Sequence, residues 1–365
     1  MVRSERKERV ELEARFEKFK YNITKDRIRR SNGSQLSTVS RINNTTTFIM
    51  ISGDSSQVGK SSICLGVLGG ILKNNYAKPE EIGYVKPATQ CEKPTMVSKF
   101  CRTHGIESIP IGPIVFFSGF TRSFLRGEQR TTEEMLNEVF DAVKKLARGK
   151  KFVLVDGVGF PSVGSICGVS NANIASKLGI PVLLVGKKGV GEAVDSTNRN
   201  IAYFEKYGVT VLGSIFNKLP VDREYYNKAK CQEYVGYYFK QYNPSHKLYG
   251  FIPEIEALKG ANKPPTAPSS EERAPDENKQ RKLKASDDVK MTEEESKRAN
   301  TFINAFCKNV NLSVLLKDAS SPRSELPILQ PNVHSKSVEG LAKSGLRVSR
   351  DSIESAAKGK GAKGG

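Results

Sequence analysis

The sequence predicts an α/β protein in which a doubly wound, mostly parallel sheet is covered by helices on both faces. Short apolar, β-prone runs alternate with helical stretches at regular spacing between residues 47 and 255. Such alternation is typical of parallel sheets whose strands are connected by helices. A loop bounded by glycines also joins the first apolar run to the first helical run. The 365 residues are enough for one large domain of this kind with extensions.

The first element, residues 47–62, combines a strand, a loop of small residues and the start of a helix. Residues 48–51 form an apolar run long enough for a buried strand, and the loop between Gly53 and Gly59 follows. Small residues let backbone N–H groups turn inward around an anion, and a helix N-terminus adds partial positive charge. We therefore predict a phosphate-binding loop.

In such a loop, Lys60 would neutralise the outer phosphates and the Ser61 hydroxyl would complete the shell of a bound Mg²⁺. Five residues separate the two glycines, whereas the strict pattern has four, so an ordinary strand–turn–helix connection is the alternative. The candidate nucleotide-binding residues of this stretch are Gly53, Asp54, Ser55, Ser56, Gln57, Val58, Gly59, Lys60, Ser61 and Ser62.

Two further polar residues follow predicted strands. Residues 82–90 form a short strand that ends in a Lys-Pro turn, which places Lys86 at the carboxyl end of a strand, beside the ligand crevice. Residues 151–156 form a buried strand that ends in Asp156, where P-loop proteins commonly carry a carboxylate on the Mg²⁺ side. The alternatives are an exposed lysine before a proline and an aspartate that merely ends a strand.

The remaining elements follow the same alternation. We expect a helix and a loop between Pro94 and Gly112, a strand over 114–117, a basic loop over 121–126 and a capped helix that begins at Thr131. A loop and a helix are expected from Val163, followed by a strand over 180–185, a helix over 192–207 and a strand over 209–216. The series ends with a tyrosine-rich helical stretch and a last strand over 248–252. The tyrosines at 225, 226, 234, 237 and 238 are expected to form a packing face.

The five-residue spacing of the loop resembles dethiobiotin synthetase, whose loop reads Gly-Thr-Asp-Thr-x-x-Gly-Lys-Thr. Ser55 stands where that family has its aspartate, and Phe160 stands where it has the last glycine after the acidic strand. The segments from Ser170 to Gly186 and from Gly208 to Asn217 are also similar to this superfamily, and more so to its sibling ATPases of unsettled substrate. The resemblance covers about residues 47–255.

The resemblance implies roles for two residues. Lys86 aligns with a second lysine that faces the reacting carbamate and the γ-phosphate, and Asn217 closes the strand where the superfamily contacts adenine. A guanine-binding protein would carry Asn-Lys-x-Asp at this place. Position 220 is proline, so we expect ATP and not GTP.

Two functions are compatible with these motifs. The first is an ATP-dependent, ligase-type enzyme that activates a carboxylate or carbamate of a small-molecule substrate for C–N bond formation, with Lys60 and Lys86 as catalytic residues. The second is a nucleotide-dependent regulatory ATPase without a small-molecule product. Both require ATP and Mg²⁺, with Ser61 and Asp156 as metal ligands, and the relatives imply a homodimer.

Composition argues against several other classes. The formal charge is +19, but basic residues are spread along the chain and mixed with acids, and no RNA-recognition motif is present, which argues against a nucleic-acid partner. Six cysteines show no CxxC pairing, so we expect reduced thiols and no zinc site. No apolar run is long enough to span a membrane and no signal peptide is visible, which favours a cytoplasmic location.

Composition also suggests boundaries. We expect a charged arm over residues 1–45, the ATP-binding domain over 46–256, a disordered insert over 257–291, a C-terminal helix over 292–319 that docks on the core, and a disordered basic tail over 320–365.

Overall fold

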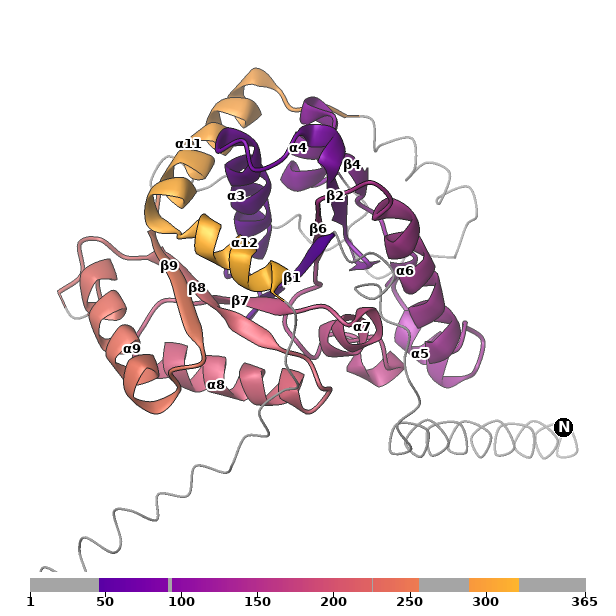
Figure 1. The fold of residues 1–365 in the computed structure, drawn as a ribbon. Coiled ribbons are helices and arrows are strands. Elements are labelled where there is room, and N and C mark those ends of the chain that lie inside the picture. Colours follow the sequence, from indigo (N-terminus) through magenta and orange to yellow (C-terminus); the bar gives the residue numbers. More distant parts are fainter. Residues whose placement is uncertain (1–45, 91–93, 225, 256–288, 322–365) are drawn as a thin grey trace, which may run out of the picture. The chain divides into compact units, whose positions relative to one another are not determined.

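The computed structural model describes residues 46–90, 94–224, 226–255 and 289–321 (Figure 1). The predicted arm of residues 1–45, and nearly all of the predicted insert and basic tail, lie outside these ranges. The predicted boundaries therefore stay predictions.

A seven-stranded parallel sheet forms the centre of the domain. Its strands lie in the order β4 (Glu107–Ile109), β2 (Ile82–Val85), β6 (Phe152–Asp156), β1 (Thr47–Gly53), β7 (Val182–Gly186), β8 (Val211–Leu219) and β9 (Lys247–Pro253). This confirms the predicted doubly wound parallel sheet. The strand order reverses beside β1, and in open α/β sheets ligands bind outside the carboxyl ends of the strands at such a point.

Two details of the sheet differ from the sequence prediction. The expected strand at 114–117 exists as β5 (Ile114–Val115), but it pairs with β3 (Ala88–Thr89) in a separate two-stranded sheet. Strand β4 lies in a stretch where only a helix and a loop were expected. Its three residues are too few to show a two-residue periodicity, which explains why the pattern missed it.

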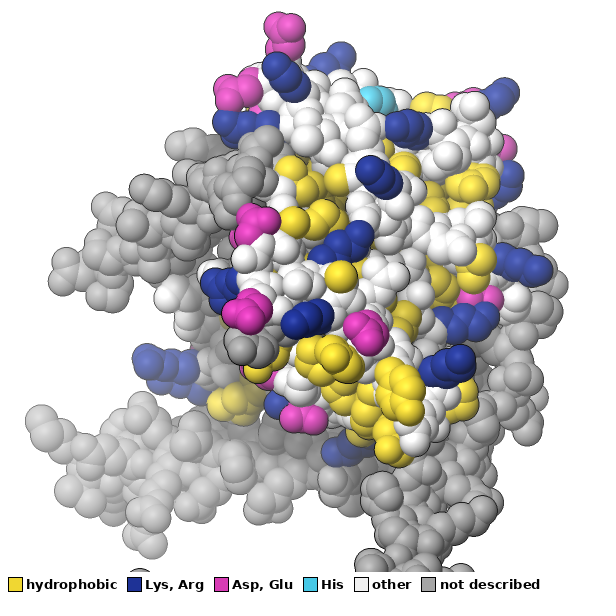
Figure 2. Space-filling model, turned by 90° about the vertical axis from the view of Figure 1, so that its left-hand side faces the viewer, with side chains coloured by type: hydrophobic (Ala, Val, Ile, Leu, Met, Phe, Trp, Pro, Cys, Tyr) yellow, Lys and Arg dark blue, Asp and Glu magenta, His cyan; other side chains and the backbone are white. Residues whose placement is uncertain are grey.

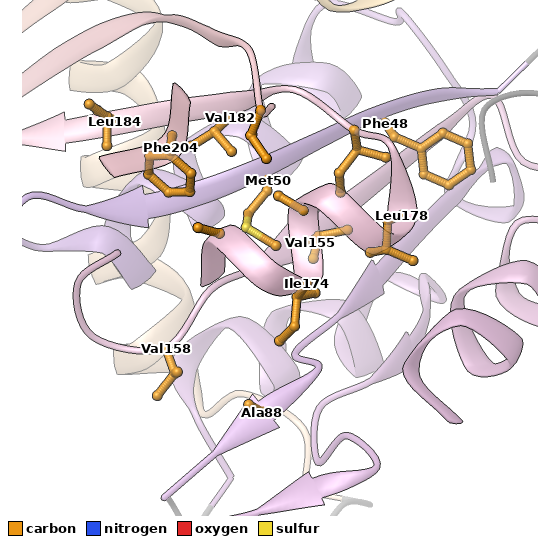
Figure 3. Close-up of a cluster of buried hydrophobic side chains, with 14 of the residues drawn as sticks. Phe48, Met50, Ala88, Val155, Val158, Ile174, Leu178, Val182, Leu184 and Phe204 are labelled. Atoms are coloured by element: carbon orange, nitrogen blue, oxygen red, sulfur yellow. The ribbon is translucent and has the colours of Figure 1, made fainter. Parts of the chain in front are cut away.

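Alternate residues of the strands divide the core into two layers. Phe48 and Met50 of β1 face one cluster, and Ile49 and Ile51 face the other. The first cluster, drawn in Figure 3, lies under α6 (Thr132–Leu146), α7 (Asn171–Leu178), α8 (Gly191–Glu205) and α9 (Lys228–Tyr242). The second lies under α3 (Lys60–Lys73), α4 (Met96–His104), α11 (Glu293–Asn309) and α12 (Leu312–Ser320). Helices therefore cover both faces, as predicted (Figure 1).

Local capping explains where several helices begin. Thr131 and Glu134 form the predicted capping box of α6, and Ser170 with Asn173 does the same for α7. Three short helices, η1 (Pro79–Glu81), α5 (Phe120–Leu125) and η2 (Ser165–Cys167), complete the described elements, and α5 replaces the basic loop expected over 121–126. Within the described ranges, no helix is both long and apolar enough to cross a bilayer.

Helix α3 packs closely on α11 because it carries glycines on that face. A Cβ atom at Gly66 would overlap the ring of Phe306, and one at Gly69 would overlap Ile303. The single helix expected over 292–319 is in fact two helices. The break lies at Val310, which forms a β-bridge with Gly250 of β9.

The tyrosines in and just before α9 are only in part a packing face. Tyr238 contacts the ring of Phe239, but Tyr234 and Tyr237 of α9 are 52% and 68% exposed, and Tyr226, which precedes the helix, is 54% exposed. Tyr225 lies outside the described residues. Figure 2 shows hydrophobic side chains gathered on the lower half of this side of the molecule, with Lys and Arg scattered among Asp and Glu above them. The expectation was wrong for these three because a run of large side chains looks the same in the sequence whether it faces the core or solvent.

The glycine contact gives a stability prediction. We expect Gly66→Ala to lower the free energy of unfolding by about 1–2 kcal/mol, because the overlap with the fully buried Phe306 outweighs the gain in helix propensity. Gly236→Ala in α9, where a Cβ meets nothing within 4 Å, should instead stabilise the protein by up to about 1 kcal/mol. Urea unfolding of both variants measures the two signs, and a stabilising Gly66→Ala would contradict the packing.

His246 is a buried histidine directly before β9. Its Nε2 lies 2.8 Å from the Ser214 hydroxyl, and its ring centroid lies 4.6 Å from that of Phe239. Burial lowers the pKa of His246 from 6.5 to about 4. Between these two values the unfolded chain binds a proton that the folded chain does not.

A pH dependence follows. As the pH falls from 7 to 4, uptake of this proton by the unfolded chain should remove on the order of 3 kcal/mol of stability. In His246→Gln this part of the loss should disappear, so its stability should fall less steeply over the same range. Urea unfolding at pH 7, 5.5 and 4.2 checks this, with His104→Gln on the exposed end of α4 as the control. Equal slopes for wild type and His246→Gln would contradict the prediction.

Candidate nucleotide-binding site

The loop between β1 and α3 has the tight backbone that its small residues allow. Gln57 and Gly59 both have positive φ, at 64° and 89°, and Gly59 is the residue before the first turn of α3. A Cβ at Gly53 would lie 2.8 Å from the carbonyl oxygen of Gly159, so the loop and the segment after β6 approach each other closely. Glycine is required at both ends of the loop for these reasons.

The carboxyl end of β8 supports the loop from one side. The side-chain amide of Asn217 donates to the carbonyl of Val58 at 3.0 Å, and the ammonium of Lys218 donates to the carbonyl of Gln57 at 2.8 Å. Asn217 is buried and also lies against Gly59. Its amide nitrogen thus holds the loop. The sequence had assigned this residue to adenine contact only.

Helix α8, which lies on the face of the sheet opposite α3, also holds the loop. The carboxylate of Asp54 accepts a hydrogen bond from the Ser196 hydroxyl at 2.6 Å and another from the Asn200 amide at 2.7 Å. The Asp54 side chain is buried and directed toward α8. Of the predicted loop residues, Asp54 therefore uses its side chain for anchoring, and only its backbone is left for a ligand.

The carboxylate of Asp156 sits in the centre of a buried cluster. Its Oδ1 forms an ion pair with Lys60, and its Oδ2 accepts a hydrogen bond from the Tyr84 hydroxyl at 2.7 Å. Burial alone would raise the pKa of Asp156. The ammonium groups of Lys60 and Lys86, together with the hydrogen bonds from Lys60 and Tyr84, outweigh burial and hold that pKa below its usual value. Asp156 is therefore ionised at neutral pH.

Lys86 brings a second positive charge to the same place. The residue is 7% exposed, directly follows β2, and its charge acts on Asp156. Among the residues that the structure describes, no carboxylate forms an ion pair with Lys86. Both lysines therefore act on the Asp156 carboxylate, and positive charge gathered around this carboxylate favours an anionic ligand.

The structure brings most of the predicted site residues together. Lys60, Lys86 and Asp156 converge from α3, β2 and β6, while Ser61 is exposed at the start of α3 and Ser62 half-buried beside it. Ser56 and Gln57 are exposed at the tip of the loop, Ser55 is half-buried and Val58 is buried. Sequence reasoning missed Tyr84, Ser196, Asn200 and Lys218, because the partners of these side chains depend on which strands and helices become neighbours.

This fold and this loop define a P-loop nucleotide-binding protein. The sequence profile of the AAA_26 family, described as an AAA domain, matches residues 47–262, which is more than half of the chain. The chain therefore belongs to the AAA_26 family, within the dethiobiotin synthetase-like P-loop ATPases that its motifs resemble.

Two curated relatives are dethiobiotin synthetases, and the chain matches them over a shorter stretch. The chain is similar to two ATP-dependent dethiobiotin synthetases from strains of Anaeromyxobacter dehalogenans, at 33% and 31% identity over 86 residues. The match covers 24% of this chain and spans only 38% of the length of those relatives.

Among solved structures, the chain is similar to a ParA family ATPase from Chlorobium tepidum. The identity is 10% and the TM-score 0.39, over 73% of this chain and 97% of the other. It is also similar to a nucleotide-binding protein in complex with ADP from Archaeoglobus fulgidus, with 13% identity and a TM-score of 0.35, over 60% of this chain and 86% of the other. Similarities of this size carry no inference about function.

The support that Asn217 gives to the loop leads to a prediction about base selectivity. Asn217→Ala should weaken binding of ATP and GTP alike, by about five- to tenfold, because a buried hydrogen bond to the loop is lost. Competition with a fluorescent ATP analogue measures both affinities. Asn198→Ala, which removes the hydrogen bond that the Asn198 side-chain amide donates to the Tyr238 hydroxyl, is the control. A loss confined to ATP would show that Asn217 acts on the adenine ring instead.

Proposed function

We propose that the protein is a Mg·ATP-dependent enzyme of the ligase type, which activates a carboxylate or carbamate of a small molecule for C–N bond formation. The observation that carries the proposal is the convergence of Lys60, Lys86 and Asp156 at the carboxyl edge of the sheet, with two positive charges and one negative. The family membership supports an ATPase, and the partial match to dethiobiotin synthetases supports the reaction class.

The residues present fit a nucleotide and a magnesium ion. Excess buried positive charge next to a helix N-terminus suits phosphate groups, and the exposed Ser61 hydroxyl and the ionised Asp156 carboxylate are the oxygen ligands that Mg²⁺ prefers. Ser61 and Asp156 would hold the metal, and Mg²⁺ would neutralise charge on the phosphates. The exposed Ser56 and Gln57 leave the tip of the loop open to the nucleotide.

The two lysines would have different tasks. Lys60 begins α3 directly behind the loop, so it would bind the outer phosphates in the ground state. Lys86 comes from β2 on the other side of Asp156 and has no ion-pair partner among the described residues, so it would meet the transferring phosphoryl group and the acceptor. A charge-stabilising donor of this kind acts mainly in the transition state.

A second function is favoured by one specific contact. The carboxylate of Asp54 ties the first turn of the loop to Ser196 and Asn200 of α8. Through this contact a nucleotide-dependent movement of the loop would reach α8 directly, which is what a regulatory ATPase needs. The predicted homodimer and cytoplasmic location belong to both functions and are proposed with them.

Turnover separates the two functions. In the ligase, Lys86→Ala should keep ATP affinity within a few-fold of wild type but lower turnover by about 10²-fold or more. The assay is ADP release with diaminononanoate and bicarbonate, followed by a wider panel of carboxylates and amines. Lys150→Ala, which removes a lysine paired with Glu107 away from the loop, is the matched control and should keep full turnover.

Two results would contradict the ligase. One is the absence of stimulation by every member of the panel. The other is ATP hydrolysis by Lys86→Ala at the wild-type rate. Either result, with ATP binding intact, would favour the regulatory ATPase.

A further inference from the structure

The hydroxyl of Tyr84 reaches the candidate site although the ring belongs to the core. Its ring is fully buried within β2, in the same cluster as Ile51 and Leu154, and its hydroxyl lies 2.7 Å from Oδ2 of Asp156. Strands β2 and β6 are direct neighbours, with Tyr84 opposite Leu154 in the register. The place of this hydroxyl is therefore set by the sheet and the packed core, and no flexible stem intervenes.

The two carboxylate oxygens of Asp156 have partners that differ in charge and in flexibility. Oδ1 pairs with Lys60, a charged group on a long side chain that belongs to the phosphate loop. Oδ2 binds Tyr84, a neutral group on a rigid ring in the core. If Lys60 binds phosphates, its ion pair with Asp156 must weaken when the nucleotide binds. The hydrogen bond from Tyr84 to Asp156 is not affected in this way, because the tyrosine hydroxyl is not proposed to bind the nucleotide.

We infer that Tyr84 is a positioning residue that holds Asp156 by Oδ2, so that Oδ1 stays directed at the phosphate loop when Lys60 turns to the nucleotide. The released Oδ1 is then already placed for the metal side of the site. Without the hydroxyl, the carboxylate could rotate about its Cβ–Cγ bond and follow Lys60. This inference rests on the proposed binding of Mg·ATP. A group that orients a metal ligand in this way typically affects metal affinity by 10- to 100-fold.

The chain offers a close control. Tyr249 of β9 is also a buried tyrosine in a strand of the same sheet, and its hydroxyl donates to Asp318 at 2.9 Å, outside the candidate site. Tyr84→Phe and Tyr249→Phe each remove one buried hydroxyl that binds an aspartate. A merely structural role of Tyr84 would give the two variants the same behaviour toward the ligand.

The experiment titrates Mg²⁺ at a fixed concentration of a fluorescent ATP analogue, and repeats the binding in EDTA. Tyr84→Phe should raise the Mg²⁺ concentration for half-maximal binding about tenfold and leave the affinity in EDTA within about twofold of wild type. Tyr249→Phe should leave both unchanged. Melting temperatures of the ligand-free variants report any general loss of stability.

A double-mutant comparison tests the route of the effect. If Tyr84 acts through Asp156, adding Tyr84→Phe to Asp156→Asn should not raise the Mg²⁺ requirement further. This comparison can still be made if Tyr84→Phe alone does not fold. In the double variant the carboxylate of Asp156 is replaced by an amide, so loss of the Tyr84 hydroxyl leaves no buried carboxylate without its hydrogen bond. A wild-type Mg²⁺ requirement in Tyr84→Phe, or additive effects in the double variant, would overturn the inference. Absence of ATP binding by the wild type would instead overturn the proposed function, and the inference with it.

Discussion

The buried ion pair between Lys60 and Asp156 is the contact on which the candidate site depends. It joins the helix after the loop to the neighbouring strand β6, and the two side chains are only 11% and 1% exposed. Removing two charges from water costs several kcal/mol per ion unless further groups satisfy them. Tyr84 supplies a hydrogen bond to the carboxylate, whereas Lys86 adds a second positive charge that this carboxylate cannot fully balance. Positive charge thus gathers around Asp156, and phosphate groups would suit this place.

The backbone around the loop imposes a second constraint. Gly53 lies against the carbonyl of Gly159, and Gly59 lies against the side chain of Asn217. The loop is thus held between the segment that follows β6 and the end of β8, and Gly59 also needs its positive φ. Support from separate strands makes the loop rigid before any ligand binds, and a rigid anion site loses less entropy on binding than a flexible one.

Much of this architecture could be predicted from sequence because it depends on local patterns. A strand, a glycine-bounded loop and a helix follow one another in residues 47–73, and parallel strands must end at the same edge, which brought Lys86 and Asp156 close to Lys60. The role of Tyr84 could not be predicted in the same way. In the sequence, Tyr84 has the pattern of an ordinary core residue. Its hydroxyl can bind Asp156 only because β6 lies between β1 and β2 in the sheet.

The same reasoning explains two contacts that the sequence did not predict, those of the Asp54 and Asn217 side chains. The direction of the Asp54 side chain depends on the turn that leaves β1, and the target of the Asn217 amide depends on where the loop folds back. Neither is a property of residue type or spacing. Strand β4 and helix α5, with three and six residues, are too short for a periodicity to develop.

The position of the loop acid has a consequence for how the molecule can work. The related family carries its aspartate one residue later, where this chain has Ser55, and here Asp54 is turned into the layer of α8. On the opposite face, α3 is packed against Phe306 of α11 with no room for a side chain at Gly66. The loop therefore connects two close-packed layers, and close-packed layers transmit a displacement and do not absorb it. A displacement of Lys60 would therefore reach both layers, so the proposed catalysis through Lys86 and the proposed signalling through Asp54 would act through one mechanically coupled site.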